Sequence, residues 1–161
     1  MQPLRRLLVP HDLSSHADDA LEIAAKLAGA DGDLLVLHVV VPVMPTADMA
    51  AISFQIPIGE MIADAKRHLE RIVAQRVGPR GPKARVVIVV GDPYRSIVEH
   101  ARERDAIVMP TRGRTGLAHL VIGSVAEKVV RHSAIPVLTF RPEAARRMVR
   151  SRAPKARRRA A

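Results

Sequence analysis

Residues 108–130, VMPTRGRTGLAHLVIGSVAEKVV, combine the residue types of a phosphate-binding loop. Gly113 lacks a Cβ, so neighbouring backbone amides can approach an anion closely, and Arg114 adds a positive charge beside it. Gly123 and Ser124 stand just before an amphipathic stretch, where a hydroxyl and the amides of a helix N-terminus can bind phosphate oxygens. The same residues also suit a plain turn followed by an ordinary N-cap serine, so both interpretations stay open for this loop alone.

A second candidate lies near the N-terminus, in the sequence VPHDLSS. Asp12 directly follows an apolar stretch, where its carboxylate could hold Mg²⁺ or Mn²⁺ bridging to phosphates, or a ribose hydroxyl. The alternative is an aspartate or serine that only caps the next helix. His11 could reach a phosphate as a cation at mildly acidic pH, but such loop histidines are more often partly solvated, and we leave it out of the predicted site.

These candidates depend on the elements that must position them, and apolar segments alternate with amphipathic ones along the chain. Five runs rich in Val, Ile and Leu are predicted strands, at residues 4–10, 33–42, 84–90, 106–110 and 135–140. Helical spacing predicts four helices, from residue 14 or 15 to about 29, from 59 to the GPRGP breaker, from 93 to about 101, and over 124–132. The capping residues agree with these bounds: Ser14 or Ser15 is the N-cap of the first helix with Gly29 near its end, and Asp92 is the N-cap of the third with Pro93 at its first position. This pattern predicts an α/β fold, with an open, five-stranded, mostly parallel doubly wound sheet and helices on both faces.

In such a sheet, ligands bind beyond the carboxyl ends of the strands, where the strand order reverses. For the order 3-2-1-4-5, this point lies between the first and the fourth strand. The loops that follow these two strands carry Asp12 and the segment from Gly113 to Ser124. Both candidates are therefore expected at one crevice.

Length and charge divide the chain into a folded part and a tail. A chain of 161 residues with 48% hydrophobic content is long enough for one buried core. Residues 142–161 hold eight Arg and Lys against Glu143 alone. Eight minus one leaves a charge of +7 in this segment, which is most of the chain's net charge of +10. We predict one domain over residues 1–141 and a basic, disordered tail over 142–161. The tail could also recruit an acidic partner or nucleic acid by counterion release, although it has no aromatic residue for base stacking.

Several function classes find no support in the sequence. The absence of cysteine excludes disulfides, thiol catalysis and cysteine-ligated metals. No apolar run approaches the roughly 20 residues of a membrane helix, and the N-terminal residues lack a run of signal-peptide length, so we expect a cytoplasmic protein without a membrane partner. The histidines are scattered, and no Gly-Lys-Ser/Thr follows a predicted strand. We therefore predict no catalytic residue, and expect any hydrolysis of a bound nucleotide to be slow.

Four segments resemble the universal stress protein family, in its ATP-binding type: LLVPHDLSSHADDAL, LLVLHVV, GDPYRSIVEHA and, above all, RGRTGLAHLVIGSVAEKVVRHSAIPVL. The resemblance covers about residues 4–141. It implies the fold predicted above, a homodimer formed through the last strand, and ATP bound with Mg²⁺ or Mn²⁺. It also implies a regulatory or protective role in the stress response.

The family's nucleotide signature is Gly-x2-Gly-x9-Gly-Ser/Thr, and this chain departs from it at the first position. Gly113 is the second glycine and Gly123–Ser124 the final pair, but Pro110 replaces the first glycine. Proline has no amide hydrogen, so any hydrogen bond that the missing glycine's amide would make to the nucleotide is lost. Such a loss, of order 1 kcal/mol, would weaken nucleotide binding severalfold. The φ of proline is also fixed, which could change the backbone shape of the pocket. The resemblance implies these binding residues, with Asp12 also as metal ligand: Pro10, Asp12, Val39, Met109, Pro110, Gly113, Arg114, Gly123, Ser124 and Val125.

Two functions remain at this point. The first is an ATP-binding regulatory protein that holds the nucleotide between the loops after its first and fourth strands, with binding retained but weakened. The alternative is a nucleotide-free dimeric interaction module, in which Pro110 has ended ATP binding and the basic tail binds an acidic partner or nucleic acid.

Overall fold

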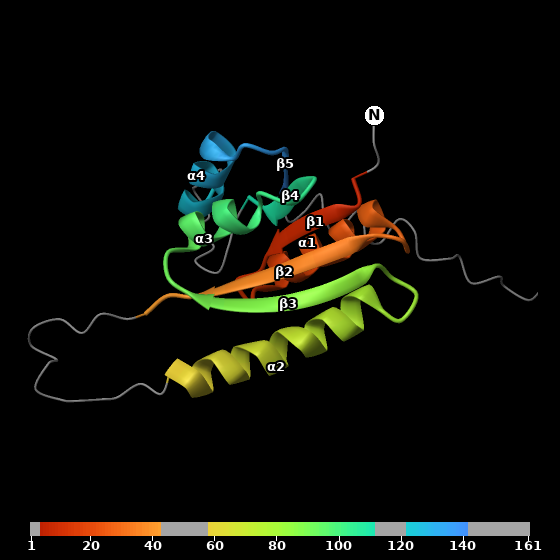
Figure 1. The fold of residues 1–161 in the computed structure, drawn as a ribbon, viewed down its shortest axis with the longest axis horizontal. Helices are drawn as coiled ribbons and strands as arrows, with labels where there is room; N and C mark the ends of the chain where they lie inside the picture. The colour runs from red at the N-terminus through yellow and green to blue at the C-terminus, as the bar shows by residue number, and fades with distance from the viewer. Residues whose placement is uncertain (1–3, 43–57, 112–121, 142–161) are drawn as a thin grey trace, which may run out of the picture.

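The fold is one parallel sheet of five strands in the order β3-β2-β1-β4-β5 (Figure 1). The structure is a computed structural model, and it describes residues 4–42, 58–111 and 122–141. The strands are β1 (Arg6–Pro10), β2 (Asp33–Val40), β3 (Lys83–Val90), β4 (Ala106–Pro110) and β5 (Val137–Phe140). The predicted fold class and strand order are confirmed.

Four helices cover the two faces of this sheet. They are α1 (Ser15–Ala28), α2 (Ile58–Val77), α3 (Pro93–His100) and α4 (Ser124–His132). One apolar cluster joins the sheet to α1 and α2, and a separate cluster on the other face joins it to α3 and α4. The sheet is therefore doubly wound, as predicted.

The helix boundaries follow from local capping chemistry. At the start of α1, the Ser14 hydroxyl accepts a hydrogen bond from the Ala17 amide, and Gly29 ends the helix with φ at 69°. At the start of α3, the Asp92 carboxylate accepts from the Arg95 amide at 2.8 Å, and Pro93 occupies the first helical position. These caps were all predicted.

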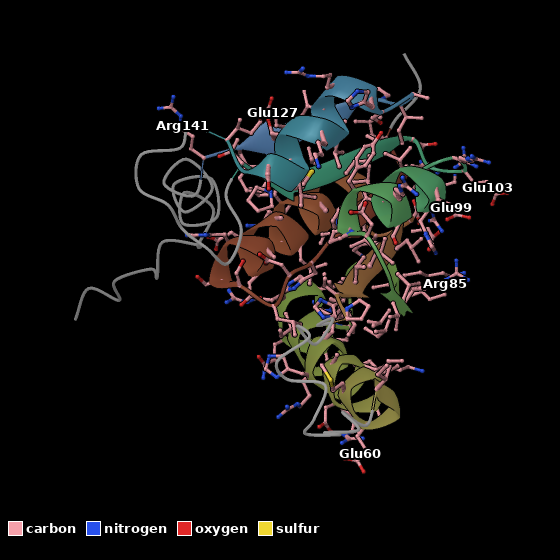
Figure 2. All side chains as sticks on the ribbon, turned by 90° about the vertical axis from the view of Figure 1, so that its left-hand side faces the viewer. Glu60, Arg85, Glu99, Glu103, Glu127 and Arg141 are labelled. Carbon is pink, nitrogen blue, oxygen red and sulfur yellow. The ribbon has the colours of Figure 1, made fainter. Side chains whose placement is uncertain are left out.

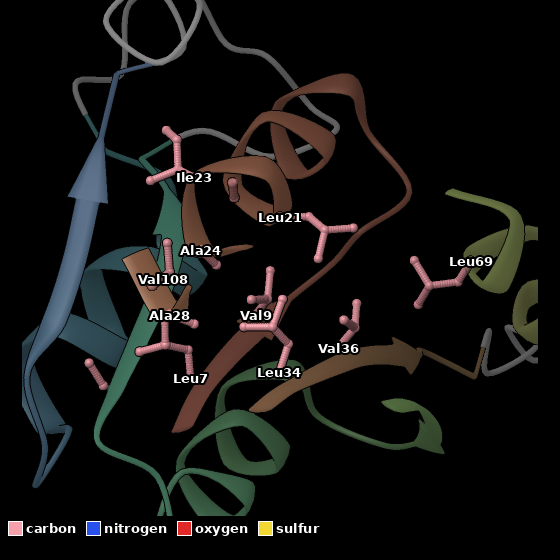
Figure 3. Packing of buried hydrophobic residues seen from close by; sticks show 12 residues of the cluster. Leu7, Val9, Leu21, Ile23, Ala24, Ala28, Leu34, Val36, Leu69 and Val108 are labelled. Carbon is pink, nitrogen blue, oxygen red and sulfur yellow. The ribbon is translucent and has the colours of Figure 1, made fainter. Parts of the chain in front are cut away.

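The core lies against the middle of the sheet. β4 is buried along its whole length, and β1 is buried apart from Arg6. Figure 3 shows Leu7, Val9, Leu21 and Val36 packed between the sheet and α1. Charged side chains such as Glu60, Glu99 and Glu103 point outward in Figure 2. Burial of the central strands on both faces fixes the positions of the loops at their carboxyl ends.

Candidate functional site

A cavity of about 400 Å³ lies at the carboxyl end of the sheet, beside the point where the strand order reverses between β1 and β4. The loop after β1, the end of β2, the first turn of α3, the end of β4 and the start of α4 all contribute to its wall. Its size is within the range of small-molecule sites in proteins. The predicted strand order alone indicated a crevice at this place.

Most of the residues that the sequence analysis selected meet at this cavity. Eight of the ten line it: Pro10, Asp12, Val39, Met109, Pro110, Gly123, Ser124 and Val125. Gly113 and Arg114 lie outside the described residues. The structure thus brings together residues from both loops that were predicted to form one site.

The loop after β1 orients the carboxylate of Asp12. Its Oδ1 accepts hydrogen bonds from the backbone amide of Ser14 at 3.1 Å and from the Ser14 hydroxyl at 2.5 Å. Ser14 is also the N-cap of α1, so Asp12 supports the capping residue and is not itself the cap. The capping interpretation therefore holds for Ser14, whereas Asp12 lines the cavity.

His11 is buried, contrary to the expectation of a partly solvated loop histidine. Its side chain is fully inaccessible, and its Nε2 lies 3.2 Å from Oδ1 of Asp18. Desolvation by burial lowers the pKa of His11 to about 4, although the carboxylate of Asp18 acts in the opposite direction. The ring is consequently neutral at mildly acidic pH, and the earlier idea of a cationic phosphate partner is wrong.

His38 also lines the cavity, although no sequence motif marked it as a site residue. Its Nδ1 lies 2.7 Å from the backbone oxygen of His11. Because a carbonyl oxygen can only accept, Nδ1 of His38 carries the hydrogen. This bond ties the end of β2 to the loop that carries Asp12.

The missing amide hydrogen of Pro110 affects the cavity and not the pairing of β4 with β5. The amides of Ile107 and Thr111 donate to backbone oxygens on the β5 side of β4. Since amides alternate in direction along a strand, position 110 faces β1. Pairing between β1 and β4 reaches only Leu8 with Ile107, so an amide at 110 would face the opening between the two strands. Proline therefore removes a donor at the crevice without breaking the pairing with β5.

At the start of α4, the backbone amide of Gly123 is not available to a ligand. Gly123 is the N-cap, and its own amide donates to the Thr111 oxygen at 2.7 Å. The alternative interpretation of Ser124 as an ordinary N-cap is therefore wrong, because Ser124 is the first helical residue. The first hydrogen bond of the helix runs from the Glu127 amide to the Gly123 oxygen, so the amides of residues 124–126 precede it and have no intrahelical acceptor. These amides form the positive end of the helix dipole.

A divalent cation would depend on few protein ligands here. Within the described part of the chain, no group of three or more His, Asp or Glu side chains could hold a metal ion. Asp12 is the single carboxylate among the described residues that line the cavity. One carboxylate together with phosphate oxygens and water is a common way to bind Mg²⁺, so this wall fits a nucleotide-bound cation better than a resident metal.

Helices that could span a membrane are likewise absent from the described segments.

Comparison with known proteins gives consistent results. The model of the universal stress protein family matches residues 3–141. Universal stress protein YxiE of Bacillus subtilis is 31% identical over 146 residues, covering 84% of this chain and 98% of that protein. The structure of MJ0577 from Methanocaldococcus jannaschii matches with a TM-score of 0.73 at 28% identity, covering 87% of this chain and 97% of that one. A universal stress protein solved in complex with cAMP matches with a TM-score of 0.58 at 23% identity, covering 88% and 99%, which shows the shared fold.

Proposed function

The chain belongs to the universal stress protein family, and on this premise we propose that it binds ATP, together with Mg²⁺ or Mn²⁺, in the cavity between the loops after β1 and β4. The observation that carries the proposal is the convergence of Asp12, Val39 and Ser124 on one cavity. These residues come from three separate segments of the chain.

The chemistry of the cavity wall supports a specific orientation of the nucleotide. The amides at residues 124–126 and the Ser124 hydroxyl suit phosphate oxygens. Asp12 would hold the cation that bridges those phosphates. The apolar residues Leu37, Val39 and Ile97, which line the same cavity, suit the face of the adenine base.

This site supports binding more readily than catalysis. The imidazole of His11, the buried titratable group of the cavity wall, is engaged with Asp18 and Leu13 instead of facing a substrate as a base. We therefore propose that the protein binds and sequesters ATP in a regulatory role in the stress response. Its turnover should stay below about 1 s⁻¹, the lower end of the range for ordinary enzymes.

Isothermal titration calorimetry of the full chain with Mg-ATP tests this function. Saturable heat is expected for the wild type, and Asp12→Asn should weaken binding at least about tenfold, because it removes the one carboxylate among the described residues of the cavity wall. Glu127→Gln is a matched control, since Glu127 pairs with Arg131 on the exposed face of α4. The proposal fails if the wild type gives no heat and no thermal shift at millimolar Mg-ATP.

Dimerisation through β5 is a second part of the proposal. β5 forms an edge of the sheet, and its residues Val137, Leu138 and Phe140 are half-buried in the single chain. Pairing with a twofold copy would satisfy the edge and cover these side chains. Light scattering should give the mass of a dimer at tens of micromolar, and a monomer there would remove the dimer.

The nucleotide-free alternative also has an observation in its favour. Pro110 lacks an amide at the crevice, and the Gly123 amide is already engaged with Thr111. In that case the basic tail, which lies outside the described residues, would supply the binding function. Truncation at residue 142 separates the two functions. If the alternative holds, nucleic-acid retention in a gel-shift assay is lost with the tail. If the first function holds, the truncated protein binds Mg-ATP as the full chain does.

A further inference from the structure

We propose that His11 is a positioning residue that holds Asp12 in the orientation needed to bind the nucleotide's cation, an inference that rests on the proposed function. His11 and Asp12 are adjacent in the loop after β1, and both line the cavity. The side chain of His11 is turned inward, away from solvent, so it acts on the loop and not on the ligand.

The loop contains a strained residue that needs such support. Leu13 has φ at 63°, and it is the single non-glycine residue with positive φ in the described part of the chain. The left-handed conformation is unfavourable for a residue with a Cβ, and it persists only where the surroundings impose it. Because Leu13 directly follows Asp12, its conformation helps to set the direction in which the carboxylate points.

The imidazole of His11 provides that support directly. Its Nδ1 accepts a hydrogen bond from the backbone amide of Leu13 at 3.1 Å. Nδ1 must therefore be unprotonated, which leaves the hydrogen on Nε2, 3.2 Å from Oδ1 of Asp18. The ring thus connects the strained residue on one side to a carboxylate of α1 on the other.

The backbone of His11 is fixed as well. Its amide donates to the Leu37 oxygen at 2.8 Å, and its oxygen accepts from Nδ1 of His38 at 2.7 Å. On the far side, Oδ2 of Asp18 accepts from Nη2 of Arg76 at 3.2 Å, which ties the carboxylate to α2. The backbone of His11 is therefore held by two hydrogen bonds to β2, and its ring lies against the Asp18 carboxylate of α1, which is itself paired with α2. A residue fixed on so many sides can impose a geometry on its neighbours.

Two substitutions separate the two contacts of the ring. His11→Asn keeps an acceptor close to the position of Nδ1 but removes the contact with Asp18. His11→Gln keeps a donor close to the position of Nε2 but removes the acceptor for Leu13. His100→Asn is a matched control, because Nδ1 of His100 bonds only to the Ser96 oxygen within α3.

The test measures Mg-ATP affinity by calorimetry and the backbone chemical shifts of Leu13 in the ligand-free full chain. We expect His11→Gln to weaken Mg-ATP binding about tenfold and to move the Leu13 shifts away from left-handed values, because the strained conformation loses its acceptor. His11→Asn should bind within about threefold of the wild type and keep those shifts. Melting temperatures of the two variants are measured alongside, since a merely structural role would lower stability without separating their affinities.

Several results would overturn the inference. It fails if His11→Gln binds Mg-ATP as the wild type does, if both variants lose affinity equally, or if the Leu13 shifts in His11→Gln are unchanged. A wild type that gives no heat with Mg-ATP overturns the proposed function and, with it, the nucleotide part of this inference. The Leu13 shifts then still decide whether His11 holds the loop.

Discussion

Replacing Pro110 by alanine should strengthen nucleotide binding. The substitution restores a backbone amide at a position that faces the opening between β1 and β4, where their pairing has already ended. It leaves the pairing with β5 intact, because the amide of the next residue, Thr111, makes the bond to the Phe140 oxygen. The new donor would therefore be available to a ligand in the cavity that Pro110 lines.

The size of the effect follows from the partner of the new bond. A hydrogen bond between neutral groups contributes about 1 kcal/mol, and one to a charged phosphate oxygen about 1.5–3 kcal/mol. These values already include the exchange of water for the new partner. A net gain of about 1–2 kcal/mol lowers the dissociation constant roughly fivefold to thirtyfold. Alanine should at the same time cost about 0.4–1 kcal/mol of stability, because the unfolded chain gains freedom.

Calorimetry with Mg-ATP measures the affinity, and denaturant unfolding measures the stability. Pro136→Ala is the control, because it restores an amide just before β5, outside the residues that line the cavity. Pro110→Gly shows whether backbone freedom adds anything beyond the donor. An affinity of Pro110→Ala within twofold of the wild type would refute the reasoning that a missing donor at this position limits binding.

Further predictions concern stability. The pKa of His11 is lowered from 6.5 to about 4 in the folded protein, so the unfolded state binds a proton first as the pH falls. The contribution of His11 to the free energy of unfolding should therefore be complete above about pH 6.5 and decrease by about 3 kcal/mol toward pH 4. In denaturant titrations, His11→Gln should remove most of this pH dependence, and an unchanged slope would contradict it. Leu21→Ala should cost about 2–5 kcal/mol of unfolding free energy, because Leu21 is fully buried between α1 and the sheet. Asp92→Ala should cost about 1 kcal/mol by removing the cap of α3, and a loss near zero would show that the Arg95 amide finds another acceptor.

Much of the fold could be predicted because it depends on local signals. The pair Asp92–Pro93 marked the start of α3, and Gly29 marked the end of α1 with its positive φ. The crevice followed from the alternation of strands and helices, since the reversal of strand order fixes where ligands bind. Two strand starts were predicted less accurately. β1 begins at Arg6 and β5 at Val137, each two residues later than predicted.

The rest depended on contacts between residues distant in sequence. His11 is buried where Asp18 of α1 lies against its ring and His38 of β2 bonds to its backbone oxygen, and nothing in the local sequence shows that approach. The use of the Gly123 amide by Thr111 is a tertiary contact of the same kind. The direction of the position-110 amide could have been found, because the alternation of amides along a strand follows once the neighbouring strands are known.

The most direct test of a nucleotide site in this cavity is a titration of the ¹⁵N-labelled full chain with Mg-ATP, followed through its backbone amide signals. Saturable shifts are predicted at Asp12, Val39 and Ser124, with the amino ends of the strands, such as Arg6, unaffected. Shifts that do not saturate at millimolar Mg-ATP, or that map away from these three residues, would contradict the account.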